Sequence, residues 1–169
     1  MSRLEATFSR IRVAGNGPGL VTYITAGDPD LPRTEGILRT LDRAGADVLE
    51  VGVPFSDPLA DGPVIQRATE RALASGTTLT DVVEMVGRLR AGLQAPIVLF
   101  SYANPILRLG VEPFADLARD AGVDGVLVLD LPIEEAGEFR GVLAARGVDT
   151  ILLLSPTTTD ERLRRAVSL

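Results

Sequence analysis

The sequence of 169 residues contains no cysteine and no histidine, and all 17 of its basic residues are arginine, so lysine is absent as well. Without cysteine the chain has neither a disulfide framework nor a thiol nucleophile nor a cysteine–zinc site. Without histidine it lacks the usual general base near neutral pH and the commonest metal ligand. Without lysine it cannot form a Schiff base or carry pyridoxal phosphate covalently. If this chain catalyses a reaction alone, its acid and base groups must therefore be Asp, Glu or Tyr.

A strongly positive surface and a long apolar segment are also missing. The formal net charge of −6 works against nucleic acid and anionic membranes as partners, because both require a dense positive field. No apolar run reaches the roughly 18 residues of a membrane span. Charged residues interrupt the first twelve positions, unlike a signal peptide. We therefore expect a cytoplasmic protein that binds any anionic substrate through local donors such as helix N-termini.

Short apolar, β-branched runs alternate with amphipathic segments along the chain. Strands are predicted at residues 20–26, 47–51, 95–102, 123–129 and 148–154. Helices are predicted at residues 4–11, 32–44, 63–75, 79–93, 111–121, 133–146 and from 160 onward. In the fourth helix Thr80 is the predicted N-cap and Glu84 lies near the capping-box position, and a loop is predicted through Asn104 and Pro105. Three joints, at residues 45–47, 122–124 and 147–149, repeat a glycine, a small apolar residue and an aspartate before a strand.

Near-continuous apolar strands separated by helices predict a parallel sheet with right-handed crossovers, which leaves a doubly wound sheet and a (β/α)₈ barrel as alternatives. No G-x-G-x-x-G follows the first strand, so a dinucleotide-binding fold loses its main support. Polar residues follow strand after strand, and in a barrel these strand ends converge on one mouth. The barrel is therefore favoured, although about five strands in 169 residues fall short of the roughly 250 residues typical of this fold. We expect one domain over residues 1–169, an incomplete TIM barrel.

Two carboxylates flank a proline-rich loop after the second strand, which makes residues 50–63 a candidate active site. Strand alternation places Glu50 on the side opposite Leu49 and Val51. If those two pack on helices, Glu50 points into the barrel, where burial would raise its pKa and suit a general acid/base. The structural alternative for Glu50 is an ion pair with an arginine. Asp61, just before a predicted helix, is equally compatible with an N-cap, and Asp57 with a turn.

The string E-V-G-V-P-F-S-D-P-L-A-D-G at residues 50–62 resembles the signature of the tryptophan synthase alpha subunit, which is close to L-E-[LV]-G-[VI]-P-F-S-D-P-x-A-D-G-P. The similarity continues in Y-I-T-A-G-D-P at residues 23–29, in Y-A-N-P at 102–105 and in D-L-P-I-E-E at 130–135. It extends over essentially the whole chain. The resemblance implies an eight-stranded barrel, of which this chain would be the N-terminal part.

The resemblance also implies a reaction and the residues that perform it. The reaction is cofactor-independent retro-aldol cleavage of indole-3-glycerol phosphate to indole and glyceraldehyde 3-phosphate, a lyase step of L-tryptophan biosynthesis. Glu50 corresponds to the acid/base that protonates the indole ring carbon and helps to deprotonate the side-chain hydroxyl. Asp61 corresponds to the carboxylate that binds the indole N–H. The implied indole pocket is lined by Tyr23, Phe100, Tyr102, Leu127 and Leu129.

The resemblance further implies an alpha2-beta2 complex in which only the beta subunit carries pyridoxal phosphate. No metal is implied. The residues that match the face docking the beta subunit are Pro54, Asp57, Pro58, Asn104, Pro132, Glu134 and Glu135. These residues argue mildly against the first alternative, a stand-alone lyase that releases free indole.

The family continues beyond the segment matched by this chain, through a sixth strand, a mobile loop and glycine-rich loops that bind the phosphate. We therefore expect residues 1–169 alone to bind the substrate poorly and to leave the edges of the first and fifth strands unpaired. A second alternative follows for the chain as written, namely an inactive fragment that only binds a partner.

Overall fold

The computed structural model describes residues 1–15 and 17–168 and contains one parallel sheet of five strands. The strands lie side by side in chain order: β1 (Val21–Thr25), β2 (Val48–Gly52), β3 (Ile97–Ser101), β4 (Gly125–Val128) and β5 (Asp149–Ile151). Strands β1 and β5 are the two edges of this sheet. The prediction of an α/β fold with about five parallel strands is therefore confirmed, and its order is the one expected when each crossover returns to the neighbouring position.

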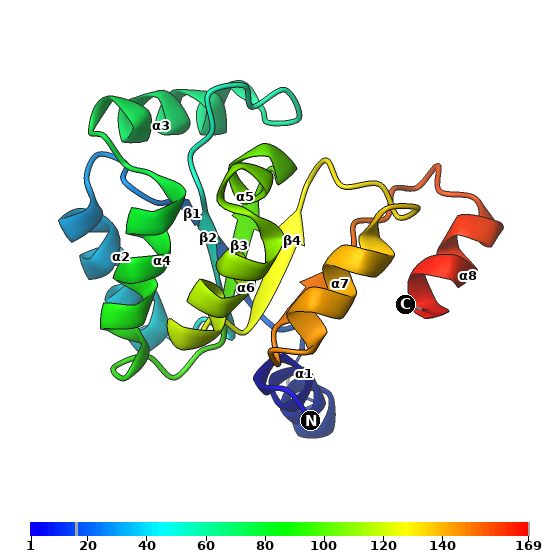
Figure 1. Cartoon of the computed structure of the whole chain (residues 1–169). Helices are drawn as coiled ribbons and strands as arrows, with labels where there is room; N and C mark the ends of the chain where they lie inside the picture. The colour runs from blue at the N-terminus through cyan, green and yellow to red at the C-terminus, as the bar shows by residue number, and fades with distance from the viewer. Residues whose placement is uncertain (16, 169) are drawn as a thin grey trace.

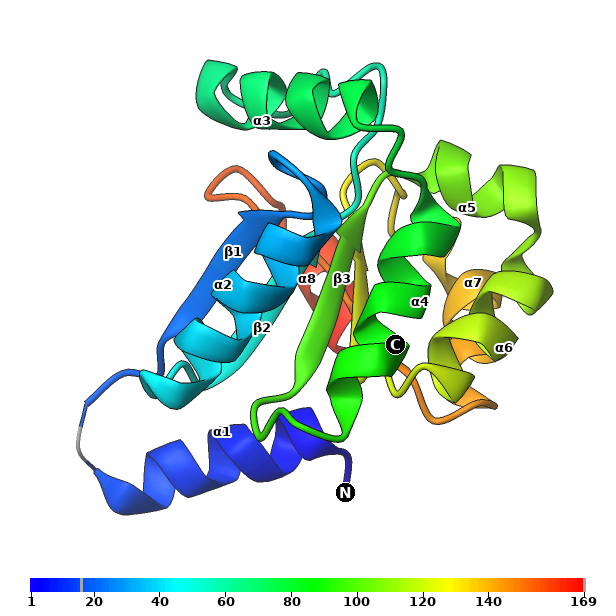
Figure 2. The ribbon, with the colours of Figure 1, turned by 90° about the vertical axis from the view of Figure 1, so that its left-hand side faces the viewer.

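Helices form a layer on one face of the sheet (Figures 1 and 2). The helices of the described residues are α1 (Arg3–Ala14), α2 (Leu31–Arg43), α3 (Pro63–Ala74), α4 (Leu79–Arg90), α5 (Ala103–Leu109), α6 (Val111–Asp120), α7 (Ala136–Ala144) and α8 (Asp160–Ser168). The layer runs α2, α4, α6, α7, whereas α1 crosses the N-terminal ends of the strands and α3 lies beyond their C-terminal ends (Figure 2). Within the described residues, no helix is both long and apolar enough to cross a membrane.

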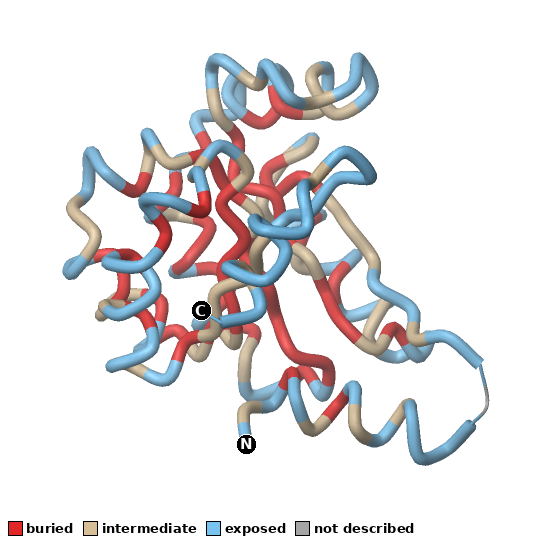
Figure 3. Tube along the Cα trace, turned by 90° about the vertical axis from the view of Figure 1, so that its right-hand side faces the viewer, coloured by how far each residue is buried: buried red, intermediate tan, exposed pale blue. Residues whose placement is uncertain are grey.

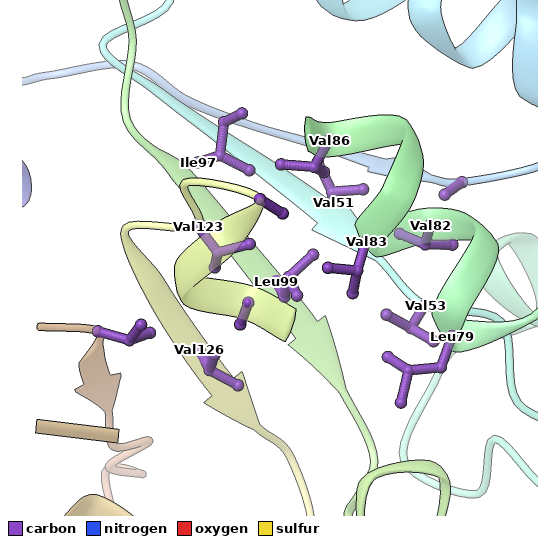
Figure 4. Close-up of a cluster of buried hydrophobic side chains, with 14 of the residues drawn as sticks. Val51, Val53, Leu79, Val82, Val83, Val86, Ile97, Leu99, Val123 and Val126 are labelled. Atoms are coloured by element: carbon purple, nitrogen blue, oxygen red, sulfur yellow. The ribbon is translucent and has the colours of Figure 1, made fainter. Parts of the chain in front are cut away.

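The main core lies between the sheet and this helix layer, and Figure 3 shows the buried strands surrounded by exposed helix surfaces. Alternation in β2 follows the prediction, because Leu49 and Val51 are fully buried in that core. Figure 4 shows Val51 beside Val83 and Val86 of α4. Each such side chain contributes about 1.5–3 kcal/mol on burial. The remaining β2 side chains, including Glu50, are thereby directed to the opposite face of the sheet.

Aspartates in the helix-to-strand joints fix the N-terminal ends of the strands. Asp47 accepts the backbone N–H of Leu20 at 2.9 Å, just before β1. Asp124 accepts the backbone N–H of Ile97 at 2.8 Å, the first residue of β3. The aspartate before one strand therefore satisfies a backbone donor at the start of the strand preceding it in the sheet. This pairing aligns neighbouring strands, so that their C-terminal ends meet at one rim.

Several predicted boundaries were wrong. Helix α4 has Thr78 as its N-cap and Asp81 in its capping box, not Thr80 and Glu84. Residues around Asn104 form helix α5 and not a loop, because Pro105 occupies the third helical position, where a proline needs no N–H partner.

The elements near the C-terminus are shorter than predicted. Helix α7 begins at Ala136 and not at residue 133. Strand β5 covers Asp149–Ile151 and not residues 148–154. As an edge strand it pairs with β4 alone among the described strands, and Ile151 is the last residue with a partner in that register.

Candidate active site at the carboxyl ends of the strands

Glu50 lies in the middle of β2, between Tyr23 of β1 and Val98 of β3 in the sheet register. Its side chain lines a cavity of about 580 Å³ together with Val48 and Val98. Burial among these apolar neighbours raises the pKa of the Glu50 carboxyl, as predicted. None of the ion pairs formed by the described residues includes Glu50, so the alternative of a structural arginine partner has no support.

Asp61 ends the proline-rich loop that follows β2. The N-cap of α3 is Gly62, so the alternative that Asp61 is a helix N-cap is wrong. The Tyr102 hydroxyl donates a hydrogen bond to Asp61 Oδ2 at 3.0 Å. The Gln66 side-chain amide donates to the Asp61 backbone carbonyl at 2.9 Å. One contact holds the carboxylate and the other holds the backbone, so this side chain has a defined position at the rim of the sheet.

Aromatic and aliphatic side chains stand beside the two carboxylates. The rings of Tyr23 and Phe100 pack edge to face with centroids 5.4 Å apart. Phe100 and the half-buried Leu129 pack against a cluster that contains Leu127. Burial raises the pKa of the Tyr23 hydroxyl, and the negative charges of Asp61 and Glu50 raise it further. Glu50 lies opposite Tyr23 in the register of β1 and β2, so this carboxylate adjoins an apolar surface, and such a surface beside a proton-carrying group can bind an apolar ligand.

The sequence model of the family described as "Tryptophan synthase alpha chain" matches residues 8–169. The chain belongs to this family. The tryptophan synthase alpha chain of Burkholderia mallei (strain NCTC 10229) is 55% identical over 164 residues, which are 96% of this chain and 60% of the relative. This chain thus spans about 60% of the length of that relative.

Two solved structures have the same fold. Tryptophan synthase subunit alpha from Legionella pneumophila str. Paris superposes with a TM-score of 0.93 at 44% identity, covering 98% of this chain and 63% of the other. The tryptophan synthase complex from Pyrococcus furiosus has a TM-score of 0.83 at 45% identity, covering 87% of this chain and 61% of that one. The five β/α units thus adopt the arrangement found in tryptophan synthase alpha chains.

Tyr102, which is expected to line the apolar pocket, also forms polar contacts with the loop after β2. Its side chain is only 6% exposed, but its ring packs on Phe55 with centroids 5.1 Å apart. Its hydroxyl accepts the backbone N–H of Ala60 at 3.0 Å while donating to Asp61. Burial, partly offset by the Ala60 bond and reinforced by the charge of Asp61, raises the pKa of Tyr102 to about 12. Tyr102 is thus a neutral donor directed at a carboxylate.

The residues matched to the partner-docking face also lie beyond the C-terminal ends of the strands. Pro54 and Asn104 line a common groove of about 500 Å³ between the loop after β2 and helix α5. The half-buried Pro58 and the exposed Asp57 lie further along that loop. Exposed positions on the loop before α7 are Pro132, Glu134 and Glu135. Of these, Glu134 forms an ion pair with Arg162, whose side-chain nitrogen lies 3.2 Å from the Glu134 carboxylate.

Sequence reasoning missed three residues that support the site. Phe55 packs on the Tyr102 ring, and Gln66 donates a hydrogen bond to the Asp61 backbone carbonyl. Gly52 leaves room for the Tyr23 ring. Only Gly52 carried a usable signal, because a glycine inside a strand indicates close approach of another group. Among residues 1–15 and 17–168, no three His, Cys, Asp or Glu side chains gather as a metal site.

Proposed function

We propose that the protein containing this chain cleaves indole-3-glycerol phosphate to indole and glyceraldehyde 3-phosphate, in the cytoplasm and as part of L-tryptophan biosynthesis. Family membership supports the proposal. The observation that carries it is the pair of carboxylates, Glu50 opposite Tyr23 in the sheet register and Asp61 held by the Tyr102 hydroxyl at the end of the following loop. In a chain without histidine, lysine or cysteine, such a pair is the available acid/base machinery.

Glu50 is the proposed proton carrier. Its raised pKa brings the carboxyl closer to the pH at which it works, so it can give a proton and take one back. A proton is added to the indole ring carbon that bears the side chain, and a proton is removed from the adjacent hydroxyl. The carbon–carbon bond then breaks, its electron pair returns to the ring, and the hydroxyl carbon becomes the aldehyde. Atoms and charge balance without an external oxidant or cofactor.

Asp61 is the proposed acceptor for the indole N–H. Protonation of the ring carbon places positive charge on the ring nitrogen, and a fixed carboxylate near that nitrogen stabilises this charge as it develops. The edge-to-face pair of Tyr23 and Phe100, with Leu127 and Leu129 beside it, supplies an apolar surface for the ring. Tyr102 contacts this site through Asp61.

The test is steady-state cleavage of indole-3-glycerol phosphate by the intact gene product. Glu50→Gln should lower kcat about 10²- to 10⁴-fold, because it removes the acid/base. Asp61→Asn should lower it about 10²- to 10³-fold through loss of charge stabilisation. The matched controls are Glu84→Gln and Asp160→Asn, at exposed carboxylates on α4 and α8, which should leave kcat unchanged. Near-normal turnover of both site variants would refute the assignment.

We also propose that the loop residues Pro54, Asp57 and Pro58, with Asn104, Pro132, Glu134 and Glu135, dock a beta subunit that carries pyridoxal phosphate. The support is family membership, together with the groove that Pro54 and Asn104 line between the loop after β2 and α5. Size-exclusion chromatography of the gene product with a beta subunit should give one complex with a faster cleavage rate. A stand-alone lyase would elute separately at an unchanged rate.

A further inference from the structure

We propose that Tyr102 is a positioning residue, whose hydroxyl fixes the Asp61 carboxylate and the end of the proline-rich loop in the orientation that the reaction needs. This inference rests on the proposed function and assigns Tyr102 a role different from that of a pocket wall. It concerns a hydroxyl that bonds two consecutive loop residues, Ala60 and Asp61.

The direction of the two hydrogen bonds is fixed by chemistry. A tyrosine hydroxyl has one proton to donate, and the backbone N–H of Ala60, 3.0 Å away, can only donate to its oxygen. The hydroxyl proton is therefore available for Asp61 Oδ2, also 3.0 Å away. An ionised carboxylate has no proton of its own and accepts this bond, which is charge-assisted and stronger than a neutral one. The phenol thus bridges the loop backbone and the carboxylate.

The scaffold around Tyr102 holds the phenol rigidly. Its backbone follows β3 directly and is the N-cap of α5, so the sheet and a helix both fix its position. Its ring is buried against Phe55, which belongs to the same loop as Asp61. Because the pKa of Tyr102 is raised to about 12, the hydroxyl stays a donor throughout the neutral pH range. Rigid support of this kind is what keeps a functional side chain within a productive geometry.

The hydrogen bond from Tyr102 occupies Oδ2 of Asp61 and leaves Oδ1 to accept the proposed bond from the substrate. With Oδ2 held by Tyr102, Asp61 cannot rotate freely about its side-chain bonds, and Oδ1 takes a defined direction. A fixed acceptor stabilises charge in the transition state without reorganising during the reaction. The hydroxyl should therefore act mainly on kcat, whereas a pocket wall should act through ring contacts that a phenylalanine retains.

The experiment is Tyr102→Phe in the intact gene product, which removes the hydroxyl and keeps the ring on Phe55. We expect kcat for indole-3-glycerol phosphate cleavage to fall about 10- to 100-fold, the range of a hydrogen bond to a charged group, with a much smaller change in KM. In an Asp61→Asn background the same substitution should add less than about 3-fold, because residues that act as a unit are non-additive. Thr40→Val removes a hydroxyl on α2 that bonds the Gly36 carbonyl and should leave kcat unchanged.

A second measurement does not depend on activity. The Ala60 amide donates to the Tyr102 oxygen, so Tyr102→Phe should accelerate its hydrogen exchange, measured by NMR, at least 10-fold relative to the Gln66 amide, which bonds the Gly62 carbonyl. Unchanged kcat in Tyr102→Phe, or an effect fully additive with Asp61→Asn, overturns the positioning role. If the wild-type protein does not cleave the substrate, the proposed function fails. Amide exchange then tests separately whether the Tyr102 hydroxyl binds the Ala60 amide. An Ala60 exchange rate that Tyr102→Phe leaves unchanged would show that it does not.

Discussion

Gly52, the last residue of β2, is where a single methyl group should disturb the candidate site most directly. A Cβ built on Gly52 would lie 2.7 Å from Tyr23 Cζ and 2.9 Å from Tyr23 Cε2, and it would collide with the hydroxyl oxygen. The obstacle is space and not backbone conformation, since Gly52 is not among the residues with positive φ. Gly52→Ala must therefore displace the Tyr23 ring from its edge-to-face contact with Phe100.

The expected cost follows from overpacking against the Tyr23 ring. Inserting one methyl group into a well-packed region costs about 1–3 kcal/mol, of which about 0.5–1.5 kcal/mol corresponds to loss of an aromatic pair. For a domain of this size each kcal/mol lowers Tm by about 2–4 °C. Gly52→Ala should therefore lower Tm by about 2–12 °C. If the proposed function holds, KM for the indole substrate should rise as well, because the ring that moves belongs to the proposed pocket.

Urea unfolding followed by far-UV circular dichroism gives the stability change, and a second substitution tests its cause. Tyr23→Leu removes the ring atoms that the new methyl group would meet, so Gly52→Ala should cost about 1–2 kcal/mol less in that background than in the wild type. The matched control is Gly36→Ala on α2, where an added Cβ meets no atom within 4 Å and stability should rise by about 0.5–1 kcal/mol. Wild-type stability of Gly52→Ala, or an equal cost with and without Tyr23, would refute the steric argument.

The remaining predictions concern pH. Burial raises the pKa of Glu50, so its ionised form destabilises the fold above the unfolded pKa of about 4.3. Glu50→Gln should raise the urea midpoint at pH 7, and the gain should vanish below about pH 4, where the wild-type carboxyl is protonated in both states. Conversely, hydrogen bonds from Arg71, at 2.7 Å, hold the pKa of Asp28 below its usual range. Asp28→Asn should lower the midpoint at pH 7, and the difference should disappear as acid protonates Asp28 through its folded pKa. A urea midpoint at pH 7 that Glu50→Gln does not raise, or that Asp28→Asn does not lower, would contradict the corresponding pKa shift.

The fold could be predicted largely because its strongest signals are local. The repeated glycine and aspartate before strands mark the ends of helices, and the structure adds that Asp47 and Asp124 each bind the backbone at the start of the preceding strand. The alternation that directs Leu49 and Val51 to the helices also fixes the side on which Glu50 lies. The predicted boundaries were wrong where tertiary contacts decide them. An example is the edge strand β5, which among the described strands pairs with β4 alone.

The candidate site was predicted only in part, because its supporting contacts join residues far apart in the sequence. The spacing of Glu50 and Asp61 indicated two carboxylates at one rim, but nothing local indicated that Asp61 is bonded by a residue 41 positions away. The assignment of Tyr102 to the apolar pocket came from the family resemblance, which gives no information on the direction of its hydroxyl. The alternation rule gives the side of a strand on which a ring lies, whereas the direction of its hydroxyl depends on the loop that packs over it.

The two carboxylates differ in environment, and this difference supports different roles for them. Glu50 lies among apolar side chains, and burial alone raises its pKa, so its protonated form is favoured. Asp61 receives a hydrogen bond from the Tyr102 hydroxyl, 3.0 Å from its Oδ2, and this bond holds the carboxylate in one direction. A buried carboxyl with a raised pKa is suited to carry a proton, whereas a carboxylate held by a hydrogen bond is suited to stabilise charge from a fixed position. Because the roles belong to the surroundings and not to the residue types, the exchange Glu50→Asp with Asp61→Glu should retain more kcat than Glu50→Gln with Asp61→Asn, which removes both carboxyl groups.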